Sequence, residues 1–431
     1  MADLWPKHWT RKKLGEIADV NWGDTSVTKA SYVATGYPAY SASGPDGFLP
    51  YADYNRTGIV LSAIGAECGR TWLVKGKWSC IKNTIRFWSI HPDVDTEFLY
   101  WLTCNPAIWP KRGSAQPFIS QSDARNLIVA YPPIQEQRAI AHILGTLDDK
   151  IELNRKINET LEQMARAIFK SWFIDFEPVR AKMEGRWEKG QSLPGLPAHL
   201  YDLFPDCLVC TEFGEIPEGW EFEKIGNLVQ VIKGRSYKSE ELRESDTALI
   251  TLKSFARGGG YRPEGLKPFI GDYKFEQVVA PGEVIIACTD ITQSADVIGH
   301  AALVRRSPRY QRLVASLDIF VVRPADEKIT PAFLYYLSST ESFIEHNFSY
   351  VTGTTVLHLA KEAVTSFTFP LPPQRLIQVF TSFSNYIFNR IQQVEIENEN
   401  LASLRDILLP KLMRGELRIQ EAEIFLQERG L

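Results

Sequence analysis

The chain has 431 residues, 44% of them hydrophobic and 23% charged, a composition typical of a soluble globular protein with two or three domains. It has no run of about eighteen apolar residues, no apolar signal-peptide core at its start, and only six cysteines, so we expect a cytoplasmic protein without a disulfide framework. The net charge of −4 excludes a uniformly basic chain, but residues 1–132 carry +3, which leaves room for a DNA-binding face.

Residues 1–132 have the pattern of a mixed globular domain. Short apolar runs alternate with Gly, Pro, Asn and Asp, and the runs IVLSAIGA and TIRFWSI are typical of strands. The stretch TEFLYWLTC has helical spacing, and Thr96 is a suitable N-cap for it. The sequence therefore predicts an α+β domain that contains a short helix.

A long helix is predicted within residues 133–181, directly after Pro132-Pro133, because about forty residues follow with almost no Gly or Pro. Steps of four and three alternate along it, which is the heptad spacing of a coiled-coil seam. A helix that lies along its own domain is the simpler alternative. The seam consists of Ile140, Leu144, Leu147, Ile151, Asn154, Asn158, Leu161, Ala165, Ile168 and Trp172.

Residues 182–218 are expected to be a linker, with 3 basic and 7 acidic side chains. Its pattern leaves open whether the segment is ordered. Cys207 and Cys210 have the spacing of metal ligands, but no second such pair or nearby His pair completes a set of four. We therefore interpret them as ordinary thiols and expect no metal site.

Short sequence segments of the first half, here called words, recur in the second half in the same order. The offset between the matching words rises from 211 to 240, as insertions in surface loops would cause. Two copies of one unit are therefore predicted. The matched words are HWTRKKLGEIADVNWG with GWEFEKIGNLVQVIKG, GIVLSA at 58–63 with GEVIIA at 282–287, FLYWL at 98–102 with FLYYL at 333–337, GSAQPFIS at 113–120 with GTTVLHLA at 353–360, and Pro132-Pro133 with Pro372-Pro373.

Residues 219–371 are thus a second α+β domain, with strands at EVIIACT, AALVRR and LDIFVVRP and a helix at PAFLYYLSS with Thr330 as its N-cap. Residues 372–431 contain a second long helix and a tail. The seam of this helix lies 240 positions after the first seam. It consists of Phe380, Ser384, Ile387, Ile391, Val394, Asn398, Leu401, Arg405, Leu408 and Leu412.

Two matching seams in one chain favour helices that pack on each other. A repeat with a pseudo-two-fold axis places them antiparallel, and a helix of forty residues is about 60 Å long, so each domain would lie at an opposite end. Asn158 and Asn398 lie near the helix midpoints, where we expect a buried amide pair that fixes the register. The predicted fold class is α+β, with two globular domains separated by two long antiparallel helices in a coiled coil.

The chain lacks the motifs of most catalytic sites: it has no GxxxxGK[ST] phosphate loop and no HExxH pair. The stretch from Asn105 to Trp109, NPAIW, is only distantly like a methyltransferase loop, and we interpret it as a helix end with a proline turn. Pro92-Asp93 has no Glu-x-Lys strand after it to complete a nuclease site. We therefore expect no catalytic residue, and two similar domains suggest a reader of a two-part target.

Two segments resemble the signature segments of the specificity subunit of type I restriction–modification enzymes. They are PPIQEQRAIAHILGTLDDKIELNRKINETLEQMARAIFKSWFIDFEPVRAKMEG and GEIPEGWEFEKIGNL. The resemblance implies that each domain is a target-recognition domain for one half of an asymmetric bipartite DNA site. It also implies that the helices space these domains and dock two modification (methyltransferase) subunits.

The same resemblance implies partners that carry the chemistry of the complex. The modification subunits would use S-adenosylmethionine to methylate a flipped adenine, and restriction subunits would add ATP- and Mg-dependent translocation and cleavage. The alternative is a non-catalytic coiled-coil scaffold that joins two protein-binding domains, which would show no salt-sensitive, sequence-dependent DNA binding. A self-contained restriction–methylation enzyme would need catalytic motifs that this chain lacks.

Candidate DNA contacts are basic and amide side chains in loops, because Arg and Lys read guanine, Asn and Gln read adenine, and small polar groups hold phosphates. The simpler interpretation of each is a solvated surface side chain. The GSAQ and GTTV loops are favoured because they recur at matched positions. The candidates are Arg70, Lys75, Lys77, Lys82, Asn83, Lys111, Arg112, Ser114 and Gln116 in the first domain, and Lys233, Arg235, Lys253, Arg257, Arg305, Arg306, Thr354 and Thr355 in the second.

Overall fold

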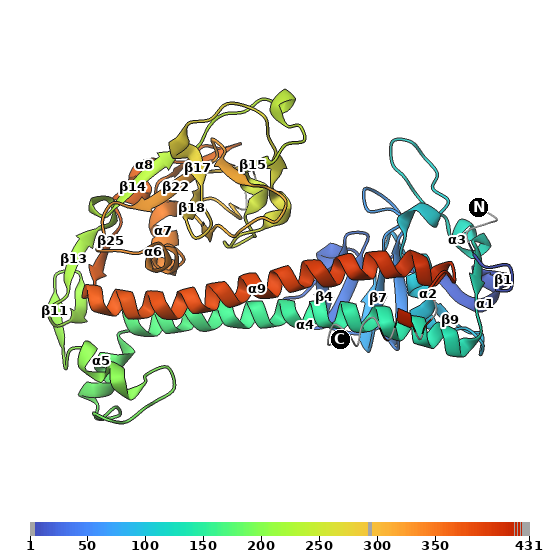
Figure 1. Cartoon of the computed structure of the whole chain (residues 1–431), viewed down its shortest axis with the longest axis horizontal. Helices are drawn as coiled ribbons and strands as arrows, with labels where there is room; N and C mark the ends of the chain where they lie inside the picture. Colours follow the sequence, from blue (N-terminus) through green and yellow to red (C-terminus); the bar gives the residue numbers. More distant parts are fainter. Residues whose placement is uncertain (1–4, 292–294, 418, 420, 423, 425–431) are drawn as a thin grey trace. The chain divides into compact units, whose positions relative to one another are not determined.

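The computed structural model describes residues 5–291, 295–417, 419, 421, 422 and 424. The chain divides into two compact units: unit 1 comprises residues 1–154 and 396–431, and unit 2 comprises residues 155–395. Two long helices, α4 (Ile134–Phe173) and α9 (Gln374–Met413), contribute to both units, and each has 40 residues (Figure 1). The two long helices predicted after the double prolines are therefore confirmed. In the part of the chain that the structure describes, no helix is both long and apolar enough to cross a membrane.

The domain of unit 1 is built on two four-stranded sheets and three short helices. One sheet has the order β2-β9-β6-β7 and the other β4-β3-β8-β5, with β3 and β8 parallel. The first sheet comprises β2 (Ala18–Trp22), β9 (Thr84–Ser89), β6 (Gly58–Ser62) and β7 (Thr71–Val74). The second comprises β4 (Gly44–Leu49), β3 (Tyr37–Ser41), β8 (Lys77–Cys80) and β5 (Tyr54–Asn55). Outside these sheets, β1 (Thr10–Lys13) pairs with β10 (Ile128–Tyr131). The short helices are α1 (Leu14–Ile17), α2 (Thr96–Thr103) and α3 (Gln121–Asn126).

The two four-stranded sheets of unit 1 recur strand for strand in the domain of unit 2. Its sheets have the orders β14-β22-β18-β20 and β16-β15-β21-β17, and β15 and β21 are again the parallel pair. The strands are β14 (Val229–Lys233), β22 (Ile319–Pro324), β18 (Val284–Ala287), β20 (Ala301–Leu303), β16 (Lys267–Pro268), β15 (Thr247–Ile250), β21 (Arg312–Ala315) and β17 (Val278–Val279). The other elements are the pair β13 (Glu221–Lys224) and β25 (Thr368–Leu371), the small sheet of β19 (Thr289–Asp290), β24 (Leu357–Leu359) and β23 (Val351–Thr352), and helices α6 (Pro331–Leu337), α7 (Glu341–Ser349) and α8 (Lys361–Thr365).

Matched glycines show why the repeated words persist. After β2 and after β14 the chain passes directly beside the turn that precedes β9 or β22. A Cβ atom at Gly23 would lie 2.6 Å from the carbonyl oxygen of Ile81, and one at Gly234 would overlap that of Ser316. Only glycine permits this approach, so the same residue recurs in both copies.

One matched word is aligned wrongly by a single residue. Phe87 and Val322 are equivalent, because they lie opposite the matched residues Val20 and Val231. Ile59 lies opposite Phe87 and Val284 lies opposite Val322, so Ile59 and Val284 occupy the same place in their sheets. The match of GIVLSA to GEVIIA instead aligns Ile59 with Glu283. The match rested on Gly58 and Gly282. Gly58 lies inside β6, but Gly282 has a φ of +87° in the turn before β18, so the two glycines are not equivalent.

The caps of the two short helices differ from each other. Thr330 caps α6 as predicted, since its side chain accepts a hydrogen bond from the backbone of Phe333. The prediction that Thr96 caps α2 is wrong: Asp95 does so, accepting from Phe98 N at 2.9 Å. Thr96 is the first helical residue, and its hydroxyl accepts instead from Ser89 N at 3.1 Å.

The long helices pack antiparallel in unit 1. Asp148 on α4 bonds Arg405 on α9 at 2.6 Å, and Asn154, further along α4, bonds Asn398, further back along α9, at 2.9 Å. Most seam residues are buried in both units, and five are only half-buried: Asn158, Leu161, Ile168, Asn398 and Arg405. The antiparallel seam is therefore confirmed within unit 1.

The prediction that Asn158 pairs with Asn398 is wrong, because Asn154 is the partner of Asn398. Asn398 is the repeat equivalent of Asn158, but its hydrogen bond comes from Asn154, one helical turn earlier on α4. The packing register of the seam places that turn opposite Asn398. Asn158 is half-buried, and its side-chain oxygen has no hydrogen-bond partner among the described residues.

The segment 182–218 is folded against the rest of unit 2. Helix α5 (Glu177–Met183) runs into its start, and the segment contains a 3-10 turn at Ala198–Leu203 and the hairpin β11 (Leu208–Thr211) and β12 (Gly214–Pro217). Trp187 is 1% exposed, and the ammonium of Lys182 donates to the carbonyl of Phe204 and pairs with Asp206 at 2.9 Å. A buried aromatic and a bound ammonium make this segment part of the core.

The thiols of the hairpin bind no partner that would suggest a metal. The Cys207 thiol lies 3.3 Å from a carboxylate oxygen of Glu218, and this hydrogen bond, together with burial, raises the pKa of Cys207. Among the described residues, no group of three or more His, Cys, Asp and Glu side chains is arranged to hold a metal ion.

Candidate DNA interface

Four loops of unit 1 meet at one end of its two sheets. The backbone of Asp24 donates to Cys80 O at 2.8 Å, that of Ala63 to Asn83 O at 3.0 Å, and that of Gly65 to Pro117 O at 3.0 Å. We name residues 23–28, 63–70, 81–83 and 111–118 the first loop surface. It brings together seven of the predicted contacts: Arg70, Lys82, Asn83, Lys111, Arg112, Ser114 and Gln116.

The 113–118 loop is a tight, preorganised turn. Arg112 and Phe118 exchange two backbone hydrogen bonds of 2.9 Å, and Gly113 has a φ of +76°, which favours glycine. Arg112 also pairs with Asp123 at 2.5 Å. Burial alone would raise the pKa of Asp123, but hydrogen bonds from Ser120 and Arg112 lower it below its ordinary value. The turn therefore presents Ser114 and Gln116, both exposed, at a fixed place.

Unit 2 has the corresponding arrangement. The backbone of Arg235 donates to Ala315 O, that of Cys288 to Asp318 O, and that of Leu359 to Cys288 O. Gly353 has a φ of +102°, and its turn repeats the turn of Gly113. We name residues 233–236, 251–260, 288–291, 295–300, 316–318 and 352–358 the second loop surface. It contains Lys233, Arg235, Lys253, Arg257, Thr354 and Thr355.

The second loop surface has a part that the first lacks. In unit 1 a tight hairpin joins β3 to β4, whereas in unit 2 residues 251–266 separate β15 from β16. This longer loop is anchored, because Gly258 N donates to Asp296 O and Gly260 N to Ala301 O, both at 3.0 Å. Arg257 is 88% exposed beside Asp296. The two surfaces are thus built on one plan with different contents.

The other four candidates lie at the opposite end of the strands. Lys75 and Lys77 follow β7, and Arg305 and Arg306 follow β20, because both strands run away from the loop surfaces. Lys75 pairs with Glu97 of α2 at 2.9 Å, and Arg305 pairs with Glu395 of α9. Lys77 lies over the ring of Tyr37. Folding contacts already occupy three of these four side chains.

Arg86 is a mostly shielded cation that the sequence analysis did not single out. Arg86 is 12% exposed, pairs with Asp19 at 2.6 Å and lies 4.1 Å from the ring centre of Trp88, which Arg56 also covers at 4.4 Å. In unit 2 the same sheet position holds Val321. A charged residue in an otherwise apolar strand, TIRFWS, is the only sequence signal of this cluster.

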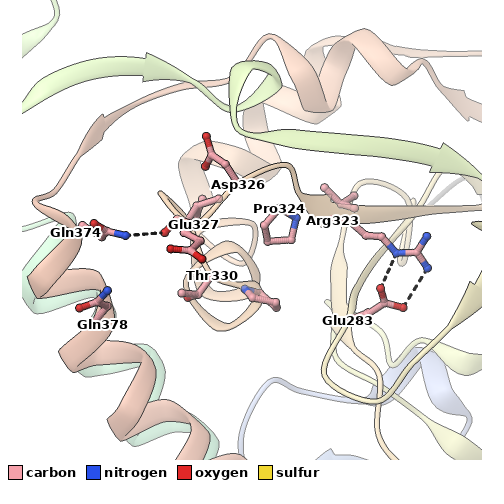
Figure 2. A pocket seen from close by; sticks show the side chains of 11 residues that line it. Glu283, Arg323, Pro324, Asp326, Glu327, Thr330, Gln374 and Gln378 are labelled. Atoms are coloured by element: carbon pink, nitrogen blue, oxygen red, sulfur yellow. Dashed lines mark hydrogen bonds and ion pairs between the residues drawn. The ribbon is translucent and has the colours of Figure 1, made fainter.

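Each unit has a hollow beside its domain. The hollow of unit 2, about 550 Å³, lies between the end of β22 and the starts of α6 and α9, where Gln374 donates to Glu327 O at 3.1 Å and Arg323 pairs with Glu283 (Figure 2). None of its lining residues is a predicted DNA contact. The hollow of unit 1, about 670 Å³, is lined by α2, the start of β7 and the end of α9, and includes Arg70. Apart from Arg70, the candidates lie outside these two hollows.

Comparisons with known proteins agree with this duplicated plan. The family model described as "Type I restriction modification DNA specificity domain" matches residues 6–163 and again residues 217–399. The HindI specificity subunit of Haemophilus influenzae is 26% identical over 83% of this chain and 86% of its own length. The MjaIX specificity subunit of Methanocaldococcus jannaschii is 26% identical over 96% of this chain and 95% of its own.

A solved structure shares the fold. The crystal structure of a type I restriction–modification S subunit from M. genitalium superposes with a TM-score of 0.52 at 16% identity, over 94% of this chain and 96% of that one. The family match covers most of the chain and occurs once in each half. The chain therefore belongs to the family of type I restriction–modification DNA specificity domains, of which it carries two copies.

Proposed function

We propose that this chain is the specificity subunit of a type I restriction–modification complex and that each domain reads one half of an asymmetric, bipartite DNA target. The observation that carries the proposal is one fold present twice with different side chains on matched loops: Ser114 and Gln116 in one, Thr354 and Thr355 in the other. Glutamine can bond both edge atoms of adenine, whereas threonine serves phosphates or a thymine methyl group. Different loops on one scaffold give a different sequence for each half-site.

The chemistry of the complex would come from its partners. Two modification subunits would bring S-adenosylmethionine and methylate a flipped adenine, and restriction subunits would bring ATP- and Mg-dependent translocation and cleavage. This chain would supply the sequence specificity and no catalytic group. Arg and Lys side chains at the two loop surfaces would make DNA binding steeply salt-dependent.

The exposed face of α4 offers a docking site for a modification subunit. Within unit 2, Ile157 and Met164 are 37% and 49% exposed and lie two turns apart on one face of the helix. Exposed apolar side chains at heptad spacing suit a partner helix. The Ile157→Lys and Met164→Lys double variant should lose co-purification with the modification subunit, while Gln163→Lys, on another exposed face, should retain it.

Mapping of methylated bases tests the function. Cells that express this chain with its modification subunit should carry one methylated motif made of two specific parts with a fixed gap. The complex should bind that motif in a salt-sensitive manner. A continuous motif, or no methylation, would contradict the proposal. Binding to proteins but not to DNA would favour a scaffold instead.

A further inference from the structure

The repeated words FLYWL and FLYYL each contain a tyrosine, and in unit 2 this tyrosine contacts an arginine–carboxylate pair of a long helix. In unit 2, Tyr335 of α6 is 4% exposed. Its hydroxyl donates to Glu162 Oε1 at 2.7 Å and accepts from Arg166 Nη2 at 2.7 Å. Arg166 Nε donates to the same carboxylate oxygen at 3.1 Å. The three side chains form a closed network between the domain and α4.

Unit 1 has a counterpart built from different residues. Tyr100 of α2 occupies the matching place in its word, and burial and then the charge of Asp148 raise its pKa. Asp148 of α4 bonds Arg405 of α9 at 2.6 Å, and Arg405 also bonds Asp406. In unit 2 the tyrosine of the repeated word bonds the arginine–carboxylate pair directly, whereas in unit 1 Tyr100 and Arg405 line the same hollow.

Apolar contacts already attach the second domain to its helices. Phe333 of α6 packs edge-on against Phe169 and Phe173 of α4, and Phe169 also meets Phe380 of α9. Aromatic burial of this kind supplies most of the attraction, but it has little directional preference. A buried ion pair contributes little net stability against apolar side chains of the same volume. The network therefore has a role other than holding the domain on the helices.

Besides the hydrogen bond from Gln374 to Glu327 O at the start of α9, three polar contacts join the second domain to the two helices at separate places. The first is the Tyr335 network on α4. The second is the ion pair of Arg305 with Glu395 of α9. The third is the 2.7 Å hydrogen bond between the hydroxyls of Thr330, the N-cap of α6, and Thr381 of α9. Hydrogen bonds weaken steeply when their angle changes. Three such contacts fix the tilt and rotation of the domain on the helices, which apolar packing alone constrains only weakly.

We propose that the Tyr335–Glu162–Arg166 network is a positioning device that sets the orientation of the second recognition domain on its helices, and thereby the length of the gap between the two half-sites. This inference rests on the proposed function. Insertion of one base pair moves a half-site by about 3.4 Å and turns it by about 35° around the duplex. A domain held at a fixed angle rejects that displacement, whereas a loosely oriented one tolerates it.

The test replaces the network by apolar or neutral side chains of similar size: Tyr335→Phe, Glu162→Gln and Arg166→Met together. The complex with the modification subunit is assayed for methylation of duplexes with the parent motif and with gaps one base pair shorter and longer. We expect the preference for the parent gap to fall by about fivefold or more, since coupled contacts of this kind contribute about 1 kcal/mol. The preferred bases in each half-site and the unfolding temperature should stay close to those of the parent.

Two controls make the result decisive. Arg309→Met with Glu244→Gln removes an ion pair of the same unit that is 63% and 81% exposed, and it should leave the gap preference unchanged. Tyr335→Phe alone removes only a hydroxyl, so it tests the same direction if the triple variant folds poorly. An unchanged gap preference in both Tyr335 variants overturns this inference alone. A parent complex that methylates no two-part motif overturns the proposed function itself.

Discussion

At the scale of single residues, Gln137 shows how one buried amide can hold the start of a helix. It is fully buried near the start of α4, accepts from Asp95 N at 2.9 Å and donates to Asp93 O at 2.8 Å and Pro132 O at 2.7 Å. The equivalent residue of the second copy is Ile377, 1% exposed. The two copies therefore solve the same junction with different chemistry.

Replacing Gln137 by Leu should destabilise unit 1 by about 2–4 kcal/mol, because buried backbone groups lose partners that water cannot replace. Chemical denaturation of the chain, followed by tryptophan fluorescence, measures the change. Ile377→Val is the matched control at the equivalent place and should cost about 0.5–1.5 kcal/mol. A loss no greater than that of the control would contradict the role assigned to Gln137.

Predictions of single residues from the sequence identify the right segment but can name the wrong side chain within it. Asp95 rather than Thr96 caps α2, and Asn154 rather than Asn158 bonds Asn398. Neighbouring residues with similar polar groups compete for one partner, and packing decides between them. The basic candidates divide in the same way: the sequence shows that Arg305 lies in a loop, but not that Glu395 binds it.

At the scale of elements, periodicity identifies the long helices and repeated words identify the duplicated strands. A seam of buried residues follows from spacing alone, because a helix has one period. Strand alignment is more fragile, since a shift of one residue exchanges the two faces of a sheet. That is why GIVLSA and GEVIIA match in letters while Ile59 stands where Val284 does.

The amide pair of unit 1 leads to a prediction about its helices. Asn154 is 2% exposed, and its amide also donates to Glu397 at 3.2 Å. The double variant Asn154→Leu with Asn398→Leu should raise the free energy of unfolding by about 1–2 kcal/mol, because two apolar side chains replace a buried polar pair. Denaturation midpoints measure this gain, and Asn154→Leu alone, which leaves Asn398 unpaired, should be less stable than the double variant. A double variant less stable than the parent would show that the amides contribute stability rather than register.

At the scale of the whole molecule, one topology occurs twice and carries two different loop surfaces. The sheets keep the same strand order, so the scaffold is insensitive to which loops it bears. The contents between the sheets differ as well, with Trp78 and Trp88 in unit 1 and aliphatic side chains such as Ile285 and Val321 in unit 2. The sequence revealed the duplication, but the loop surfaces needed the fold, because their residues are far apart along the chain.

Exchange of the matched loops should therefore change one half of the target and leave the other intact. In the variant that replaces Ser114, Ala115 and Gln116 by Thr, Thr and Val, the residues of positions 354–356, the tight turn at Gly113 is retained because the second copy makes the same turn. Loss of a base contact costs about 1–3 kcal/mol, so methylation of the parent motif should fall by about tenfold or more. Methylome sequencing should show new bases in one half of the motif, with the second half and the gap retained. Lys75→Ala with Lys77→Ala, at the far end of the strands, should leave the motif unchanged, and a motif that stays the same after the loop exchange would remove these residues from base readout.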